Sequence, residues 1–332
     1  PGEAEYSGMP RSAKSHVRVD YVLPIKQIPN KLLAYVKDYV KPEIKERENE
    51  TSSNIKNRLE DILYTLEMGS GHDFSSYKTS TLIRRIKKRM TVNQIVNIDM
   101  YIEYLNNHYL EVERLFQDIL ISVTEFFREK DSFKELKEKV IPKIFKRKQK
   151  DESVRIWVAG CSTGEEAYSI AILAQEYMNK VNKNRKVIIF ASDIDPEAIQ
   201  KAREGIYPNN IVKHLSEERL NKFFIKKDHI YKVRQDIRNM IVFAVQNALQ
   251  DPPFSKMDLI SCRNVLIYLK SDAQEKLLKT FHYSLKNEGY LFLGNSESVG
   301  MLSEFFDEID KKAKIYKKNP YISHLSGQMR PY

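Results

Sequence analysis

The chain has 332 residues and a formal net charge of +10 at pH 7, from 55 Lys or Arg and 45 Asp or Glu. This length allows two domains with separate cores, and a hydrophobic fraction of 42% favours a globular protein over a disordered one. Two cysteines exclude a disulfide framework, no Cys/His spacing indicates zinc, and no apolar run is long enough to cross a membrane. We therefore expect a soluble cytoplasmic protein without a metal, and the positive charge favours an acidic partner: nucleic acid, anionic lipid or an acidic protein surface.

The first part of the chain is expected to contain a loop with one short strand, followed by helices. Residues 19–23 form the strand candidate. Apolar residues at helical spacing predict two helices over residues 30–68. Ser52 or Ser53 is a suitable cap for the second of them, and the Gly-Ser-Gly at 69–71 ends it.

Residues 72–130 are expected to form a small helical bundle that contains one strongly basic helix, residues 81–90. Leu82, Ile83, Ile86 and Met90 share one face of that helix. Its other positions are basic: Arg84, Arg85, Lys87, Lys88 and Arg89. Five cations in six residues, with no acid among them, fit either a solvated face or a surface that faces an anion, and the sequence leaves both open.

From residue 131 onward, strand and helix patterns alternate. The predicted strands are residues 154–159, 187–191, 241–245, 259–262 and 290–293, and the predicted helices are residues 131–145, 165–179, 196–204 and 273–285. This alternation favours a mostly parallel sheet with helices on both faces. Residues 205–240 exceed the length of one crossover and predict an inserted subdomain with a strand at 230–233. Residues 305–309 and 314–317 predict an antiparallel hairpin at the sheet edge.

Two strand ends carry residues suited to a cationic nucleoside. Gly160 and Gly164 allow a tight turn from strand into helix, where ligands of open α/β sheets bind. Glu165 puts negative charge at the helix start, which suits an ammonium or sulfonium group better than a phosphate. Asp193 ends the next strand, where an acid accepts ribose hydroxyls; the other interpretation is a helix cap, but Asp195 fills that role better.

Two asparagines follow the third and fourth strands. The side-chain amides of Asn247 and Asn264 offer a donor and an acceptor to an adenine edge or to an amino-acid group. Either amide could instead satisfy its own local backbone, and the sequence does not decide between these interpretations.

Six motifs together resemble the CheR-type chemotaxis methyltransferases, which move a methyl group from S-adenosylmethionine (SAM) to receptor glutamates. They are Arg-Arg-Ile-Lys-Lys-Arg (84–89), Thr-Glu-Phe-Phe-Arg (124–128), Cys-Ser-Thr-Gly-Glu-Glu (161–166), Phe-Ala-Ser-Asp-Ile-Asp (190–195), Cys-Arg-Asn-Val-Leu-Ile-Tyr (262–268) and Gly-Asn-Ser-Glu (294–297). The resemblance covers about residues 72–318. It implies an α/β, Rossmann-like SAM-dependent methyltransferase fold with an antiparallel edge hairpin, a small all-helical N-terminal domain and a small β insertion.

The resemblance also implies roles for particular residues. The cofactor would be contacted by Ser122, Thr124, Arg128, Glu165, Asp193, Asn247, Ala248, Asn264 and Val265. Tyr268 and Arg128 would be catalytic, and Arg84, Arg85, Lys88 and Arg263 would bind the substrate. The family often has Asn in place of Ser122, so that contact is expected to be shorter or missing. The product would be S-adenosylhomocysteine, and no metal is implied.

The reaction needs little from the protein beyond positioning. A glutamate carboxylate is already ionised at neutral pH, so no general base is required. The site must hold and desolvate the carboxylate while keeping it charged. Arg128, Arg263 and Tyr268 are the candidates for this task, although Arg128 could also be an ordinary interdomain salt bridge.

Two other functions fit parts of the sequence. Asp251-Pro252-Pro253-Phe254 matches a signature of enzymes that methylate exocyclic amines of adenine, but it precedes the fourth strand instead of ending it. A nucleic-acid methyltransferase on the same fold is therefore the second hypothesis. A non-catalytic cofactor-binding scaffold, its chemistry lost through changes such as Ser122, is the third.

The N-terminal segment resembles the end of a different enzyme. This segment resembles the last part of a CheB-type receptor methylesterase, and the resemblance ends near Tyr39. It is carried by Glu3-Ala4-Glu5-Tyr6, Gly8-Met9-Pro10-Arg11-Ser12-Ala13 and Val19-Asp20-Tyr21-Val22-Leu23-Pro24. This resemblance implies a natural esterase–methyltransferase fusion, with the esterase domain upstream in the parent chain and no esterase activity in these residues.

The expected organisation thus has five parts. They are residues 1–45, the methylesterase remnant; 46–71, a linker helix; 72–130, the helical N-terminal domain; 131–318, the SAM-binding methyltransferase domain with a subdomain inserted near 205–240; and 319–332, a C-terminal tail. The expected protein partners are the cytoplasmic helices of chemoreceptor-like proteins, with neither nucleic acid nor membrane insertion involved.

Overall fold

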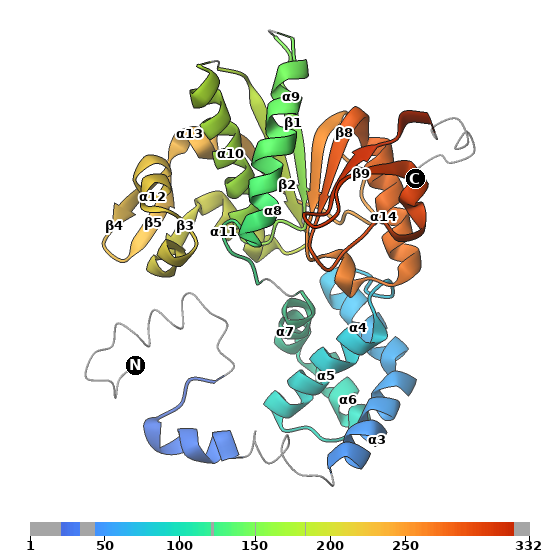
Figure 1. Ribbon diagram of the computed structural model, residues 1–332. Helices are drawn as coiled ribbons and strands as arrows, with labels where there is room; N and C mark the ends of the chain where they lie inside the picture. The colour runs from blue at the N-terminus through green and yellow to red at the C-terminus, as the bar shows by residue number, and fades with distance from the viewer. Residues whose placement is uncertain (1–20, 34–43, 121–122, 150, 183, 322–332) are drawn as a thin grey trace. The chain divides into compact units, whose positions relative to one another are not determined.

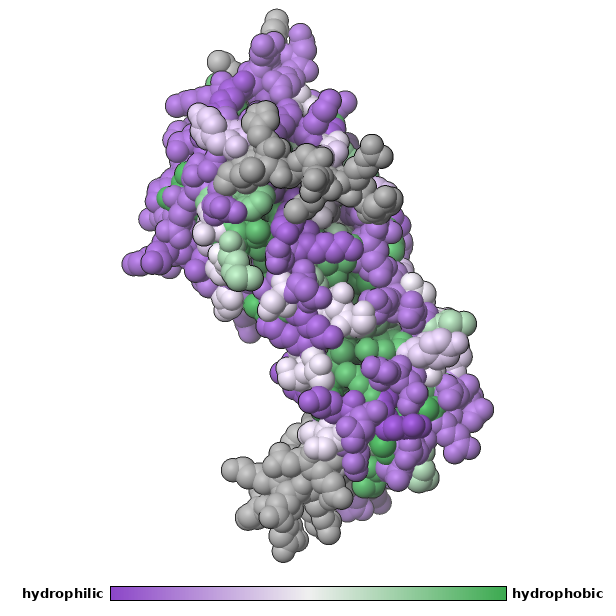
Figure 2. Space-filling view, turned by 90° about the vertical axis from the view of Figure 1, so that its right-hand side faces the viewer, coloured by the Kyte–Doolittle hydropathy of each residue, from purple (hydrophilic) through white to green (hydrophobic). Residues whose placement is uncertain are grey.

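A computed structural model describes residues 21–33, 44–120, 123–149, 151–182 and 184–321, with no side chains described for residues 44–50. The chain divides into two compact units, Pro1–Ile121 and Ser122–Tyr332, which are described one at a time. Within the described ranges, no helix has both the length and the apolar character needed to span a membrane. Figure 2 shows a mostly hydrophilic face, with hydrophobic residues in small areas between the polar ones.

The described residues of the first unit are mainly helical (Figure 1). After the 3-10 turn η1 (Ile25–Gln27), residues 28–33 are helical. The helices that follow are α3 (Ile44–Asn57), α4 (Leu59–Ser70), α5 (Thr79–Asn93), α6 (Ile98–Asn107) and α7 (Tyr109–Ile119). The described part of the predicted strand at 19–23 is irregular instead of extended in a ladder. The prediction was therefore wrong for residues 21–23, and residues 19 and 20 lie outside the described ranges.

The segment at 46–71, expected to be a linker helix, is part of the bundle core. Ile55, Ile62 and Leu66 are at most 1% exposed, and α4 packs on α7. Ser52 and Ser53 lie inside α3 and do not cap the following helix. The helices separate at Arg58 instead, and Gly71 ends α4 with a left-handed φ of 73°. Apolar spacing predicted the helices, but spacing alone did not show which surface covers them.

The second unit contains the predicted sheet, with strand order β6-β2-β1-β7-β8-β10-β9 (Figure 1). Its strands are β1 (Val154–Ala159), β2 (Val187–Asp193), β6 (Ile241–Val245), β7 (Met257–Cys262), β8 (Leu285–Leu293), β9 (Phe306–Asp310) and β10 (Ile315–Lys318). The pairs from β6 to β8 are parallel, and β8-β10-β9 are antiparallel. The predicted fold class and edge hairpin are confirmed.

Strand β1 shows how both faces of the sheet are covered. Ile156 and Val158 belong to the main hydrophobic core, which includes residues of α10 (Glu165–Val181) and α9 (Ile141–Arg147). Trp157 points to the other face, where its ring lies 5.3 Å from that of Phe281 in α14 (Ser271–Ser284). Alternate side chains of a strand face opposite sides, so a strand covered on both sides is apolar throughout.

The helix predicted over 131–145 is not regular. It consists of α8 (Lys130–Glu135), a π-helical segment η2 (Leu136–Val140) and α9. Pro142 has no N–H group to donate to the carbonyl one turn earlier, so the α-helical ladder cannot continue through it. A widened turn before the proline is the observed adjustment.

The predicted insertion is a three-stranded antiparallel sheet of order β3-β5-β4. It contains β3 (Ile206–Pro208), η3 (Asn209–Lys213), α12 (Glu217–Phe223), β4 (Phe224–Lys227) and β5 (Ile230–Val233). The connection returns to the main sheet through α13 (Gln235–Arg238). Helix α11 (Pro196–Glu204) precedes it.

Candidate functional site

The candidate site lies where the direction of strand connection reverses. β1 pairs with β2 on one side and with β7 on the other, all in parallel. The loops after these three strands therefore leave the same edge of the sheet. In open α/β sheets this switch point is where ligands bind. The site residues predicted after Ala159, Asp193 and Cys262 therefore belong to three neighbouring loops.

The loop after β1 touches the loop after β7. Gly160 has a φ of 74°, and its N–H donates to the carbonyl of Ser192 at 2.8 Å. A Cβ at position 160 would lie 2.4 Å from Cγ2 of Val265, closer than two carbon atoms can approach. Glycine is therefore required here for both its conformation and its size.

Glu165 is a buried carboxylate at the start of α10. Its side chain accepts a 2.7 Å hydrogen bond from the hydroxyl of Thr163, and the residue is 9% exposed. Burial raises the pKa of Glu165 to about 7. No ion pair of Glu165 is recorded within the described part of the chain. A buried carboxylate without a cation is costly, so this position favours a ligand that carries positive charge.

Asp193 shapes the turn after β2 and keeps part of its hydrogen-bonding capacity. One carboxylate oxygen accepts from the N–H of Ser162 at 2.7 Å, and the other accepts from the N–H of Asp195 at 3.0 Å. Burial raises the pKa of Asp193. Asp195 caps α11 by accepting from the N–H groups of Glu197 and Ala198, as predicted. An ionised carboxylate has about four acceptor sites, so Asp193 can still accept a further donor, such as a hydroxyl.

The loop after β7 is held by a carboxylate that the sequence interpretation did not single out. Glu297 is 5% exposed, and its carboxylate accepts four backbone N–H groups at 2.7–2.9 Å. One of the donor residues, Asn264, has a left-handed φ of 60°. The four donors are Gly294, Asn264, Val265 and Leu266. Glu297 was part of a quoted motif, but nothing local in the sequence links it to a loop about 30 residues earlier.

Arg263, predicted to bind the substrate, is buried inside the protein, and this prediction needs correction. Its side chain is 0% exposed and pairs with Glu129 at 2.7 Å and with Glu166 at 3.5 Å. Its guanidinium also lies over the rings of Phe133 and Phe292, at 4.9 and 4.7 Å from their centroids. A cation enclosed by two carboxylates and two rings has no surface left for a substrate.

The buried Arg263 instead positions the segment that carries other predicted site residues. Its Nη2 donates to the carbonyl of Arg128 at 2.8 Å. Arg128, half-buried, donates from Nη1 to the carbonyl of Val123 at 3.0 Å. Thr124 is half-buried in the same segment, and Ser122 lies outside the described residues. The roles predicted for Thr124, Arg128 and Ser122 remain predictions.

The amide of Asn247 is occupied by its own turn. Its oxygen accepts from the N–H of Leu249 at 3.0 Å, and its nitrogen donates to Gln250 at 3.1 Å. This geometry corresponds to the local interpretation of Asn247 that the sequence left open. Ala248 is half-buried in that turn, and Tyr268 is half-buried at the end of the 3-10 turn η4 (Leu266–Tyr268).

The Asp-Pro-Pro-Phe segment at 251–254 has a structural role. It precedes β7, as predicted, and the carbonyl of Pro252 accepts from the side chain of Gln246 at 2.8 Å. The ring of Phe254 lies 4.7 Å from that of Phe190 and 5.5 Å from that of Trp157. These contacts cover the sheet and do not build an amine-binding site at a strand end.

The basic helix α5, in the first unit, has a smaller free surface than predicted. Arg89 is 3% exposed and makes two hydrogen bonds to Glu111, at 2.6 and 2.8 Å. Lys88 pairs with Asp118 at 3.3 Å. Of the predicted substrate-binding cations on this helix, Arg84 is exposed and Arg85 is half-buried. Arg89 is therefore not part of a surface that could face an anion, and the substrate-binding role of Arg84, Arg85 and Lys88 stays a prediction.

The sequence matches two parts of one known family. Residues 57–120 match its all-alpha domain, described as "CheR methyltransferase, all-alpha domain". Residues 122–315 match "CheR methyltransferase, SAM binding domain". The second match alone covers more than half of the chain.

Individual relatives agree with this assignment. An uncharacterized 104.1 kDa protein from the hypE 3' region of Rhodobacter capsulatus is 34% identical over 340 residues, which cover 96% of this chain and 35% of that protein. This chain thus spans about a third of that relative's length. A chemotaxis protein methyltransferase of Borreliella burgdorferi is 34% identical over 74% of this chain and 89% of its own. The Escherichia coli K12 protein of the same name is 31% identical over 75% of this chain and 86% of its own. The all-alpha match lies within the helical unit, and the SAM-binding match lies within the unit with the seven-stranded sheet. The chain therefore belongs to the CheR methyltransferase family.

Proposed function

We propose that this chain is a SAM-dependent protein-glutamate O-methyltransferase that modifies glutamates on the cytoplasmic helices of chemoreceptor-like proteins. The observation that carries the proposal is Glu165, a buried carboxylate with no recorded cation partner in the described structure, at the switch point of a CheR-family sheet. Relatives named chemotaxis protein methyltransferases support the receptor as substrate. We place this activity in the cytoplasm.

The residues of the site fit the chemistry of SAM. The carboxylate of Glu165 suits its ammonium or sulfonium charge, and the remaining lone pairs of Asp193 suit its ribose hydroxyls. Because Gly160 has no side chain, the loop after β1 can pack closely against Val265 of the loop after β7. When bound, SAM supplies a methyl carbon to which a glutamate oxygen bonds in line as the carbon–sulfur bond breaks.

The protein's task towards the glutamate is to orient it without neutralising it. The glutamate is ionised at neutral pH, so no residue has to remove a proton. We propose that the Tyr268 hydroxyl and the Arg128 guanidinium hold the carboxylate, and that Asn264 and Val265 line the cofactor side. Arg263 supports this arrangement indirectly, through the carbonyl of Arg128.

The receptor is proposed to be recognised by the first unit through the exposed part of α5. The exposed Arg84 carries this proposal, with the half-buried Arg85 and with Lys88, which pairs with Asp118, as weaker contributors. Acidic receptor helices would supply the complementary charge. Arg89 has no part in it, since Glu111 already holds its guanidinium in the interior.

We also propose that the N-terminal segment derives from a methylesterase-like domain upstream in a longer protein. The motifs at 3–6, 8–13 and 19–24 support this origin. The 104.1 kDa relative supports it as well, because its match extends over 96% of this chain and leaves most of that protein's length unmatched. Sequencing the coding region upstream tests the proposal, and an open reading frame that encodes no esterase would contradict it.

A methyl-transfer assay tests the main proposal. The chain is incubated with radiolabelled SAM and a receptor cytoplasmic fragment, and the labelled fragment is then treated with alkali. A glutamyl methyl ester releases its label as methanol, so alkali-labile label on the receptor is the expected result. A receptor fragment with its acceptor glutamates changed to alanine is the control. Alkali-stable label on DNA or RNA, or SAM binding without transfer to any acidic helical substrate, would overturn the proposal.

A further inference from the structure

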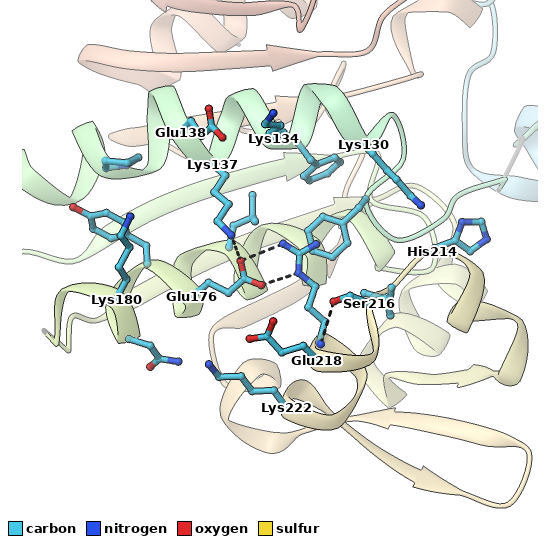
Figure 3. Close-up of a pocket in the computed structure, with 18 residues that line it drawn as sticks. Lys130, Lys134, Lys137, Glu138, Glu176, Lys180, His214, Ser216, Glu218 and Lys222 are labelled. Carbon is cyan, nitrogen blue, oxygen red and sulfur yellow. Dashed lines mark hydrogen bonds and ion pairs between the residues drawn. The ribbon is translucent and has the colours of Figure 1, made fainter.

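A cleft of about 1120 Å³ lies on the second unit, away from the strand ends described above (Figure 3). Its walls come from α8 and η2, from the end of α10, and from the region of η3 and α12. Its floor contains the buried side chains of Phe127, Phe133, Leu173 and Leu215. The cleft therefore lies within one folded unit and is lined by several of its helices.

Lysines line the cleft in a regular arrangement. Lys130, Lys134 and Lys137 follow one another at intervals of four and three residues along α8 and η2, which places them on one side of the helix. Lys222 of α12 and Lys180 of α10 lie across from them. Four of these five lysines, all except Lys137, are exposed and have no ion pair recorded among the described residues.

A cluster of ion pairs, here called the clasp, joins the walls of the cleft. Glu176 of α10 accepts from Lys137 at 2.7 Å and from two nitrogens of Arg219, at 2.7 and 3.1 Å, as Figure 3 shows. Burial alone would raise the pKa of Glu176, but the hydrogen bonds from Arg219 and Lys137 lower it. The clasp uses two of the cleft's cations, and it leaves the four unpaired lysines on a fixed frame.

The charges of the cleft favour an acidic polypeptide over a phosphate-rich ligand. Six Lys or Arg residues line it, but so do three carboxylates, of Glu138, Glu176 and Glu218. A continuous phosphate backbone would be repelled by Glu138 and Glu218, whereas a peptide can place a basic residue beside them. The ring of Phe127 is covered by Arg219, 3.9 Å away, and so offers no surface on which a base could stack.

The spacing of the lysines indicates the form of that polypeptide. Glutamates at positions i and i+4 of a helix lie on one side, at the same interval as the unpaired Lys130 and Lys134, and a glutamate at i+7 continues that side. We propose that this lysine cleft binds an acidic helical segment of a partner protein, at a site separate from the methyl-transfer site. The four free lysines would pair with its carboxylates, and Glu138 and Glu218 would select against polyanions.

The test uses the full chain and a fluorescent, helical, alanine-based peptide with glutamates at i, i+4 and i+7. Fluorescence anisotropy should show saturable binding that weakens with salt. An isomeric peptide of equal charge, with its glutamates spread around the helix, should bind at least about threefold more weakly. The double variant K134E/K222E should weaken binding of the first peptide by about tenfold.

A matched variant separates the cleft from general charge. Lys143 and Lys146 lie exposed on α9 outside the cleft, so K143E/K146E changes the net charge equally and should leave peptide affinity within about twofold. Both variants should bind SAM like the unmodified chain. Equal weakening by the two double variants would overturn the proposal. So would tight binding of tripolyphosphate or of a single-stranded oligonucleotide in the absence of peptide binding.

Discussion

Lowering the pH should weaken SAM binding, because Glu165 must lose a proton before it can face a cation. The pKa of Glu165 in the free protein is about 7, above the ordinary value for a glutamate. Below that pH the free protein is protonated at this carboxylate, and binding of a cation has to release the proton. Affinity should therefore be nearly constant above pH 7 and should fall as the pH drops below it.

The magnitude follows from the pKa. Between pH 7.5 and pH 5.5 the protonated fraction of a group with a pKa near 7 rises enough to weaken binding about 25-fold, or about 1.9 kcal/mol. Isothermal titration calorimetry at several pH values measures this, and buffers of different ionisation enthalpy should reveal the released proton. Glu165→Gln should bind SAM more weakly at neutral pH, with little of this pH dependence.

Comparing SAM binding by the wild type and by the Glu165→Gln variant tests whether Glu165 faces the cation. Titration of SAM's own amino group changes its ammonium fraction by less than about twofold over this range, so the ratio of the two dissociation constants reports mainly on Glu165. If that ratio stays constant from pH 7.5 to pH 5.5, Glu165 does not face the cation and the reasoning fails.

Four further changes test the site. Without SAM, E165Q should raise the free energy of unfolding at pH 8 by up to about 3 kcal/mol, because the variant no longer buries an ionised group. Urea unfolding measures this, and no gain over wild type would contradict the raised pKa. D193A should weaken SAM binding by about 1–3 kcal/mol in calorimetry, and unchanged affinity would remove Asp193 from the ribose site. E297Q should lower the free energy of unfolding by about 2–4 kcal/mol and weaken SAM binding. The amide nitrogen that replaces one carboxylate oxygen cannot accept the two N–H groups bound there, and normal stability would show that the carboxylate is not needed. R84E should raise the KM for the receptor fragment by about tenfold while leaving SAM affinity unchanged, and an unchanged KM would mean that α5 is only a solvated surface.

Features determined by neighbours in the sequence could be predicted. Asp195 was expected to cap α11 because a cap contacts residues two and three positions later, and it does so. The parallel strands could be predicted because a doubly covered strand is apolar throughout, as Trp157 and its neighbours show. The edge hairpin was predicted to within about one residue at each end.

Features determined by distant residues could not be predicted. Arg263 stands in a motif at a strand end, where an exposed cation would suit a substrate, but Glu129 and Glu166 enclose it from positions about 130 and 100 residues earlier. The same holds for Arg89, which is buried against Glu111 on another helix. Hydrophobic periodicity does not identify such partners, because it describes one element at a time.

The four N–H groups that converge on Glu297 have a consequence for the motion of the site. Because Glu297 belongs to the turn at Gly294 and accepts three N–H groups of the loop after β7, unfolding of that turn leaves those three donors without their acceptor. Local unfolding should therefore release both segments in one event. In native-state hydrogen exchange, the amides of Gly294, Asn264, Val265 and Leu266 would share a single opening free energy, so the two loops would behave as one cooperative unit.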